Sequence, residues 1–285
     1  MAGKPGIAIV GPGNLGTALA AELRRAGFSI EAVMARSPKS LPKARALAKP
    51  VGARAAANLN HVRAEVVWLC VPDSAIDRAA RSLATQCDWK GRIALHSSGA
   101  LTSDELDSLR RKGASVASVH PFMTFVRGSH PTLGRVPFAI EGDPAAVRVA
   151  RNIVRELGGQ SYSIRKQDKA AYHAWGTFAS PLLTALLATT EQVAAAAGVK
   201  HKAAMRRMMP ILLQTLANYA AFGAPGAFSG PIVRGDAETV ARHLRVLSPV
   251  PAAREVYLGL ARAALEYLPT KNRGALKRLL DKSQA

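Results

Sequence analysis

The stretch KPGIAIVGPGNLG, residues 4–16, decides the fold because an apolar run leads directly into a G-x-G-x-x-G turn. The apolar run predicts a buried strand. In such a turn Gly11 permits the tight bend, Gly13 lets the backbone approach a pyrophosphate, and Gly16 lets the next helix pack on the strand. The free N–H groups and the dipole of that helix attract the anion. The turn therefore predicts a dinucleotide site formed by Gly11, Gly13, Asn14, Leu15 and Gly16.

The residues after the turn continue the pattern of a strand, a helix and a second strand. Leucines at every fourth position predict an amphipathic helix that ends at Gly27, and residues 28–34 predict the next strand. An NAD site would carry an acidic residue near the end of that strand, to bind the ribose 2′-hydroxyl. This chain has Arg36 and Ser37 there instead. Unless Arg36 is only a solvated surface residue, this pair favours a 2′-phosphate, and we predict NADP(H) as the cofactor.

The composition is that of a globular protein with a substantial core, because 48% of the 285 residues are apolar. The chain carries 39 Lys and Arg against 19 Asp and Glu, a formal charge of +20. These basic residues occur in runs of one to three along predicted helices, without interleaved aromatic residues. They predict a solvated surface that favours an anionic cofactor and a small anionic substrate, and they argue against nucleic acid as a partner.

Neither a signal peptide nor a membrane span is expected. Glycines and a proline interrupt the first apolar run. Residues 170–190 lack charged side chains, but they contain a histidine, several threonines and a proline, so a buried helix is the better interpretation. Cys70 and Cys87 have neither metal-ligand nor redox spacing, so we expect no metal site and a reducing, cytoplasmic location.

Three further apolar runs predict strands whose carboxyl ends line a ligand cleft. Residues 65–71 end at Val71, and Pro72 follows; we expect both beside the nicotinamide. Asp73 comes next and is expected to cap a helix. Residues 92–95 and 114–119 are followed by polar side chains, and the predicted substrate-lining set is Ser97, Ser98 and His120.

Two histidines stand at successive strand ends, His96 and His120. Each could hydrogen-bond a substrate carbonyl or carboxylate. The alternative is that they bond to each other or to the backbone of their own loops.

The alternation of strands and helices ends near residue 165. Residues 136–143 and 160–164 predict two more strands around a helix at 144–157. Beyond them the chain predicts helices at 169–197, 200–222, 237–247 and 251–267, and a short basic helix at the end. The fold class is therefore α/β, with an N-terminal Rossmann dinucleotide-binding domain at 1–165 and an all-α C-terminal domain at 166–285. We expect the C-terminal helical domain to serve in substrate binding and dimerisation.

A line of polar side chains runs along the predicted helix 169–197, which Pro181 is expected to interrupt with a kink. Its members recur at intervals of three, four or seven residues: Lys169, His173, Thr177, Ser180, Thr184 and Glu191. Because buried unpaired polar groups cost about 1–3 kcal/mol each, a wet cleft along this face is expected. Lys169 would be charged there and act as the general acid, with His173 beside it. The alternative is a first-turn lysine and a hydrogen-bonded core histidine.

A Gly- and Pro-rich loop at 227–236 contains one arginine and one aspartate. Arg234 either binds a substrate carboxylate in a bidentate manner or pairs with Asp236. Asp236 is equally suited to cap the following helix.

These motifs together resemble the Rossmann-like proteins that carry a helical C-terminal domain of unknown function. The resemblance rests on the glycine turn and on five segments: VPD (71–73), HSSGA (96–100), HPF (120–122), residues 169–180 with Tyr172 and His173, and GPIVRGD (230–236). It covers nearly the full chain. The proteins that the chain resembles belong with the wider 6-phosphogluconate dehydrogenase-like superfamily, which includes ketopantoate reductases, pyrroline-5-carboxylate reductases and β-hydroxyacid dehydrogenases.

The resemblance implies a two-domain NADP-dependent reductase whose helical domain forms a homodimer. It also implies a catalytic role for Lys169, where the superfamily tends to keep a lysine. The chain departs from its relatives at Pro181, because they usually have Asn after the residue that corresponds to Ser180. That departure puts the identity of the substrate in question.

The predicted function is the reduction of a small 2-oxo acid by NADPH, with ketopantoate as the first candidate substrate. Lys169 is the expected general acid, His173 and Ser180 position the substrate, and Arg234 binds its carboxylate. Two alternatives stay open: the reduction of a cyclic imine acid of the pyrroline-5-carboxylate type, and a nucleotide-binding sensor or scaffold without turnover.

Overall fold

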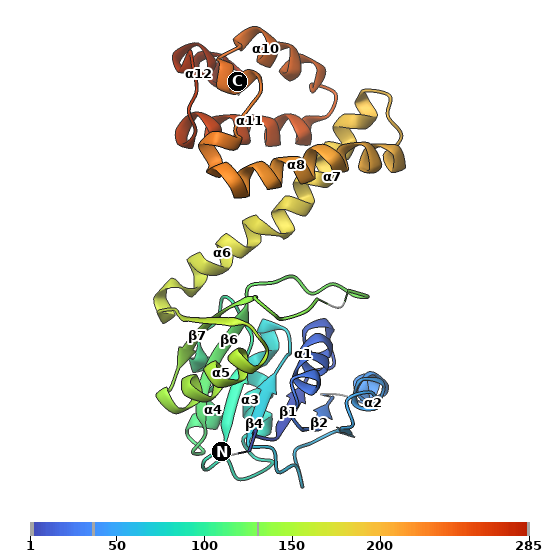
Figure 1. The fold of residues 1–285 in the computed structure, drawn as a ribbon, viewed down its shortest axis with the longest axis vertical. Helices are drawn as coiled ribbons and strands as arrows, with labels where there is room; N and C mark the ends of the chain where they lie inside the picture. The colour runs from blue at the N-terminus through green and yellow to red at the C-terminus, as the bar shows by residue number, and fades with distance from the viewer. Residues whose placement is uncertain (1–2, 36–37, 130, 284–285) are drawn as a thin grey trace. The chain divides into compact units, whose positions relative to one another are not determined.

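The computed structural model describes residues 3–35, 38–129 and 131–283 (Figure 1). The chain forms two compact units, residues 1–177 and 178–285. The division therefore falls beyond the expected boundary near residue 165, and the first turns of the helix that begins at Lys169 belong to the first unit.

Within the described residues, the first unit contains one eight-stranded sheet with the order β3-β2-β1-β4-β5-β6-β7-β8. Neighbouring strands are parallel except for β6 and β7, which are antiparallel. The strands are β1 (Ile7–Val10), β2 (Ile30–Met34), β3 (Arg54–Ala56), β4 (Val66–Leu69), β5 (Ile93–His96), β6 (Ser115–Pro121), β7 (Pro137–Gly142) and β8 (Gln160–Ser163). The carboxyl ends of β1, β4, β5 and β6 thus lie at one edge of the sheet.

Helices cover both faces of this sheet (Figure 1). They are α1 (Asn14–Arg25), α2 (Leu41–Ala48), α3 (Ile76–Leu83), α4 (Asp107–Arg110) and α5 (Pro144–Glu156), and α6 (Lys169–Ala179) follows β8. Alternate residues of β1 face opposite layers of the core: Ile7 and Ile9 pack in one apolar cluster, and Ala8 and Val10 in the other. The strands β1, β4 and β5 are buried on both faces, and this explains why their sequences are continuous apolar runs.

The Rossmann-like architecture predicted from the sequence is confirmed, with one strand missed. The strand β3 has only three residues, Arg54–Ala56, and pairs with β2 at the edge of the sheet. Its side chains are exposed or half-buried. Edge strands of this kind do not need an apolar run, so no periodic pattern marks them in the sequence.

The second unit is helical, as predicted. Its helices are α7 (Pro181–Ala196), α8 (His201–Ala227), α9 (Pro231–Arg234), α10 (Ala237–Val246), α11 (Pro251–Tyr267) and α12 (Arg273–Lys282). The core of this unit consists of Val240, Leu244, Leu258, Ala261, Leu265, Leu276 and Leu280. The predicted helix 200–222 extends to Ala227 with an interruption at Gly223, whose φ is 67°.

The predicted helix 169–197 is divided into two helices, α6 and α7. Ser180 has φ −130° and ψ −76°, outside the helical region, and Pro181 is the first residue of α7. A proline inside a helix lacks the N–H donor and clashes with the carbonyl four residues earlier. The expected interruption at Pro181 is thus confirmed, whereas a single continuous polar face from Lys169 to Glu191 is wrong.

Among the residues that the structure describes, no single helix is long and apolar enough to cross a membrane. One bent pair, Lys166–Ala196 with His201–Arg234, meets the length and composition criteria only when the two are taken together across a bend of 117°.

Candidate functional site

The glycine turn has the geometry that its sequence requires. Gly11 has φ +112°, and a Cβ there would lie 2.5 Å from the carbonyl oxygen of Cys70. At Gly16 a Cβ would lie 2.1 Å from the carbonyl oxygen of Gly11. Both positions therefore exclude every other residue type, for the two reasons that the sequence predicted: a left-handed bend and close packing of helix on strand.

Gly13 differs from the other two glycines because the space beside it is open. The nearest heavy atom to a Cβ at this position would be the carbonyl oxygen of Cys70, at 4.0 Å. Gly13 also precedes α1, which begins at Asn14 without a side-chain cap. The first-turn N–H groups are therefore free to bind an anion, and the turn has the shape of a phosphate cradle.

The remaining predicted cofactor residues lie around this turn, or outside the described part of the chain. Asn14 donates from Nδ2 to the carbonyl oxygen of Phe125 at 3.2 Å, and Leu15 packs on the apolar core. The side chain of Val71 lies beside Gly11, and exposed Pro72 follows it. Arg36 and Ser37 lie outside the described residues, so their contact with a 2′-phosphate stays a prediction.

His96, the last residue of β5, is buried and bonded to its own loop. Its Nδ1 accepts from the backbone N–H of Ser98 at 3.1 Å, so Nε2–H donates to the carbonyl oxygen of Thr102 at 2.9 Å. Burial lowers the pKa of His96 to about 4, because the charged imidazolium is poorly solvated there. Of the two interpretations of His96, bonding to loop backbone is the one observed.

The two serines after His96 are also held by internal hydrogen bonds. Trp68 donates from Nε1 to the Ser97 hydroxyl at 2.8 Å. The Ser98 hydroxyl donates to a carboxylate oxygen of Asp73 at 2.8 Å and accepts from two backbone N–H groups, those of Ala100 and Leu101. Ser98 therefore has no hydroxyl proton left for a ligand. Asp73 accepts from Ser98 and makes no cap bond, so its expected role as a helix cap is wrong.

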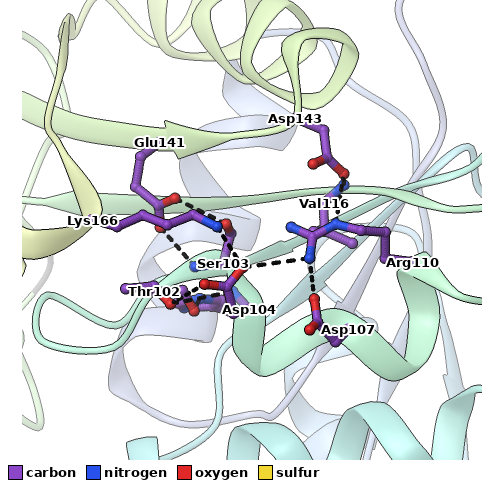
Figure 2. A network of polar contacts seen from close by, with 10 residues as sticks. Thr102, Ser103, Asp104, Asp107, Arg110, Val116, Glu141, Asp143 and Lys166 are labelled. Carbon is purple, nitrogen blue, oxygen red and sulfur yellow. Dashed lines mark hydrogen bonds and ion pairs between the residues drawn. The ribbon is translucent and has the colours of Figure 1, made fainter.

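A polar network fixes the loop that follows β5, as Figure 2 shows. Glu141 of β7 is buried and accepts from the backbone N–H of Ser103 at 2.6 Å and from its hydroxyl at 2.9 Å. Asp104 forms an ion pair with Lys166, just before α6. Arg110 ties Asp104 and Asp107 to Asp143, whose carboxylate accepts from the N–H of Val116 at 2.8 Å. The network joins the loop to β7, to β6 and to the start of α6.

Lys169 lies at the start of α6 and has no exposed area. Its ammonium donates to the carbonyl oxygen of Ser98 at 3.0 Å and to the hydroxyl of Ser118 at 2.8 Å. Burial lowers the pKa of Lys169 from 10.5 to about 8, while the nearby carboxylates of Glu141 and Asp73 act in the opposite direction. The sequence placed Lys169 in a wet cleft at its ordinary pKa; the structure instead buries it against the loop after β5.

The next residues of the same helical turn surround His120 of β6. Nδ1 of His120 lies 2.7 Å from the hydroxyl of Tyr172, and the two rings meet edge to face. The ring of His173 is 6.3 Å from that of His120. A Cβ at Gly99 would lie 2.7 Å from Cδ2 of His173 and 2.9 Å from Nε2 of His120, so both imidazoles pack closely against Gly99. Lys169, Tyr172 and His173 thus meet the ends of β5 and β6.

Several residues of the expected polar face make ordinary helix contacts. The hydroxyl of Thr177 donates to the carbonyl oxygen of His173 at 3.0 Å, and that of Thr184 donates to the carbonyl of Ser180 at 3.1 Å. Neither hydroxyl is buried, so neither requires the wet cleft that the sequence suggested.

Two predicted substrate residues, Ser180 and Arg234, belong to the second unit. Ser180 precedes α7, and Arg234 is the exposed last residue of α9. Asp236 accepts from the N–H of Thr239 at 3.0 Å and so caps α10, which is one of its two predicted roles. Contact of Ser180 or Arg234 with a substrate stays a prediction.

Sequence reasoning missed Tyr172, Ser118 and Glu141 as parts of this cluster. Tyr172 could have been found, because it lies three residues after Lys169 and so shares its helix face. Ser118 is a polar residue two positions before His120 in an apolar strand, a weaker signal. Within the described ranges, no group of three or more His, Cys, Asp or Glu side chains is arranged to hold a metal ion.

Two family models match successive parts of the chain. A Rossmann-like domain matches residues 3–121, and a domain of unknown function (DUF2520) matches residues 136–264. A comparison of the sequence with curated proteins finds no match.

Solved structures with the same fold cover almost the whole chain. A candidate NADP oxidoreductase from Bacteroides fragilis has a TM-score of 0.76 at 22% identity, over 91% of this chain and 97% of that one. A protein from Thermotoga maritima has a TM-score of 0.70 at 22% identity, over 98% and 100%. A reductive aminase from Aspergillus terreus, in complex with NADPH and ethyl-5-oxohexanoate, has a TM-score of 0.66 at 18% identity, over 98% and 99%.

Structures with lower scores include a pyrroline-5-carboxylate reductase from Coxiella burnetii, with a TM-score of 0.57 at 14% identity over 99% and 98% of the two chains. At these identities the likeness concerns the fold. The chain therefore matches a Rossmann-like model followed by a DUF2520 model, and it has the fold of these solved structures.

Proposed function

We propose that this protein is an NADP(H)-dependent reductase of a small molecule with a carbonyl or imine group. One juxtaposition carries the proposal. The phosphate cradle at Gly13 and the polar cluster around Lys169 and His120 both lie where parallel strands of one sheet end. Ligands of open α/β sheets bind at this edge, and a dinucleotide spans it.

The residues of the turn fit the proposed cofactor. The N–H groups at the start of α1 would bind the pyrophosphate, Val71 and Pro72 would line the nicotinamide side, and Arg36 with Ser37 would bind the 2′-phosphate. NADPH supplies a hydride when it is bound. The NADP oxidoreductase and the NADPH complex among the structures of the same fold support this choice.

Lys169 is the proposed general acid. A carbonyl that receives a hydride at carbon needs a proton at oxygen, and a lysine tuned by burial to a pKa of about 8 is well matched to deliver one near neutral pH. His173 and Ser180 are the proposed substrate-positioning residues, and Ser97 and His120 are proposed to line the site.

The proposed substrate is a small anionic 2-oxo acid, with ketopantoate as the first candidate. The net charge of +20 favours anions, and Arg234 is suited to bind a carboxylate through two parallel hydrogen bonds. The assignment of ketopantoate rests on the resemblance to the superfamily that contains ketopantoate reductases.

Reduction of a cyclic imine acid is the second candidate. It is supported by the pyrroline-5-carboxylate reductase and by an imine reductase from a Pseudomonas species, which share this fold. An iminium ion already carries its proton, so its reduction does not need a general acid. Activity toward an imine is therefore expected to survive Lys169→Ala better than activity toward a ketone.

The test is NADPH consumption with a panel of 2-oxo acids and cyclic imine acids, in parallel with NADPH binding by calorimetry. Turnover of ketopantoate supports the first candidate, and turnover of imines alone supports the second. Tight NADPH binding without any turnover contradicts a reductase of these substrate classes and favours a nucleotide-binding sensor or scaffold.

Gly13 and Gly16 give a matched pair of substitutions for the cofactor site. Because the space beside Gly13 is open, Gly13→Ala is expected to change the free energy of unfolding by less than about 1 kcal/mol. It should weaken NADPH binding by at least about 10-fold, because its methyl group occupies the path of the pyrophosphate. Gly16→Ala should destabilise the fold itself by about 2–3 kcal/mol, because its Cβ meets backbone.

Calorimetric titration with NADPH and urea denaturation of both variants measure these effects. Unchanged NADPH affinity in a folded Gly13→Ala protein would place the pyrophosphate elsewhere.

We also propose that the protein is a homodimer in solution and, as its free cysteines suggest, cytoplasmic. The helix α8 exposes apolar side chains that a second copy would cover: Ile211, Leu213, Leu216, Tyr219 and Phe222. Light scattering is expected to give twice the mass of the chain, and Leu216→Glu should lower that mass. A monomer mass for the unaltered protein would contradict the proposal.

A further inference from the structure

His120, which is half-buried, and Tyr172, which is buried, form a hydrogen-bonded pair between β6 and α6. The atoms Nδ1 of His120 and Oη of Tyr172 are 2.7 Å apart, and Tyr172 is 7% exposed. The ring of Phe122 packs against Tyr172 with a centroid separation of 5.4 Å. Strand and helix therefore fix both partners, and the hydroxyl of Tyr172 has a defined direction toward the imidazole.

The chemistry of the two groups decides which one donates. A phenol O–H is a stronger donor than a neutral imidazole N–H, and an imidazole nitrogen is a stronger acceptor than a phenol oxygen. Burial, and then the neighbouring hydroxyl of Tyr162, raise the pKa of Tyr172 far above its ordinary value, so the phenol keeps its proton. Tyr172 thus donates to Nδ1 of His120, and this bond leaves the ring proton on Nε2.

The surroundings also keep His120 neutral. Burial, and then the positive charge of Lys169, lower the pKa of His120 to about 4, with smaller contributions from His173 and His96. At neutral pH the ring is therefore an uncharged donor through Nε2–H. A neutral imidazole of this kind can polarise a substrate carbonyl by hydrogen bonding to its oxygen.

Nε2 of His120 is the atom of the pair that is available to a ligand. Across the described parts of the chain, Nδ1 bonds to Tyr172 and no hydrogen-bond partner of Nε2 is found. Nε2 lies beside Gly99, at the edge of the sheet where β5 and β6 end. The side chain of His120 is half-buried, whereas Lys169 has no exposed area. A ligand at this edge therefore meets His120 before it meets the ammonium.

We propose that Tyr172 is a positioning residue that fixes His120 as an Nε2–H donor, and that this donor binds the oxygen or nitrogen atom of the substrate's reducible double bond. The inference rests on the proposed reductase function, and it adds a role for His120 to it. Lys169 provides positive charge and the proton, and His120 holds the substrate atom that receives this proton. The orientation of His120 by Tyr172 is independent of any turnover.

The first test is kinetic. Tyr172→Phe keeps the ring and removes the donor, so it is expected to lower kcat by at least about 10-fold with unchanged NADPH affinity. His120→Leu should lower kcat by about 100-fold. Because both act through one hydrogen bond to substrate, the double variant should be no slower than His120→Leu alone.

A matched control lies in the helical unit, where Oη of Tyr257 is 3.1 Å from Nδ1 of His243. Tyr257→Phe removes a chemically similar bond and should leave kcat unchanged. Additive losses in the double variant, or an equal loss in Tyr257→Phe, would overturn the positioning role, because a general loss of packing would explain both.

The second test does not require a substrate. Nitrogen-15 NMR of the histidine side chains, with the His120 signal assigned from the His120→Leu spectrum, reports which ring nitrogen carries the proton. The Nε2–H tautomer is expected in the unaltered protein, and a mixture of tautomers in Tyr172→Phe. An Nδ1–H tautomer in the unaltered protein overturns the inference even if the protein is an active reductase. The expected tautomers in a protein that turns over no substrate support the positioning role and contradict the proposed function instead.

Discussion

Lys169→Met is expected to lower kcat/KM for a 2-oxo acid by at least about 100-fold, the range found when a general acid is removed. Methionine has nearly the length of lysine and tolerates burial, so the change removes the ammonium with little loss of volume. The two partners of the ammonium, the carbonyl oxygen of Ser98 and the hydroxyl of Ser118, keep one hydrogen bond in this variant. The Ser118 hydroxyl also donates to the carbonyl oxygen of Ser98. Steady-state NADPH consumption measures the effect.

The control is Lys112→Met, which removes an exposed lysine from the same unit. It should change kcat/KM by less than about 2-fold, as expected for a solvated surface charge. Full activity in a folded Lys169→Met protein would exclude Lys169 as the proton donor.

The lowered pKa of Lys169 gives this prediction a pH dependence. The ammonium is present below pH 8 and lost above it, so activity toward a ketone should fall as the pH rises through about 8. The residual activity of Lys169→Met should lack that step. A pH profile of kcat/KM for both proteins, with NADPH saturating, distinguishes them.

The free energy of unfolding also depends on the protonation of Lys169, but it should rise with pH where the activity falls. The pKa of Lys169 is about 8 in the folded protein and 10.5 in an exposed lysine. Between these values the unfolded chain binds more protons, so stability rises with pH. From pH 8 to 10.5 the unaltered protein should gain about 3 kcal/mol relative to Lys169→Met. Urea denaturation at the two pH values tests this, and equal changes in both proteins would mean that the lysine is not buried as a cation.

Gly99→Ala is expected to lower kcat/KM by about 100-fold while the protein stays folded. The new Cβ would lie 2.7 Å from a carbon of His173 and 2.9 Å from Nε2 of His120. Both neighbours are side chains, so they move aside and the backbone need not change. A displacement of about 1 Å is enough to cost two orders of magnitude when a group must meet a reacting atom.

Gly134→Ala is the matched control, because a Cβ there has no heavy atom within 4 Å and its backbone does not require glycine. Circular dichroism and NADPH calorimetry should give the same result for both variants and the unaltered protein. If Gly99→Ala retains full turnover, neither imidazole contributes to the reaction.

The strands of the first domain and its cofactor turn were predictable because local sequence carries their physics. Strands buried on both faces appear as continuous apolar runs, and a turn with a positive φ at Gly11 requires glycine. The break between α6 and α7 followed in the same way from Pro181. The edge strand β3 was missed because three exposed or half-buried residues leave no such signal.

The sequence by itself determined the Rossmann-like architecture, the helical second unit and the segments that form the candidate site. Only the tertiary structure decided what each polar side chain does there. Lys169 bonds to Ser98, 71 residues earlier, and Tyr172 bonds to His120, 52 residues earlier. Periodicity places a residue on a face of its own helix or strand, but it holds no information about the partner across the fold. Burial and the resulting pKa depend on that partner, and so does the difference between a lysine in a wet cleft and one held beneath a loop.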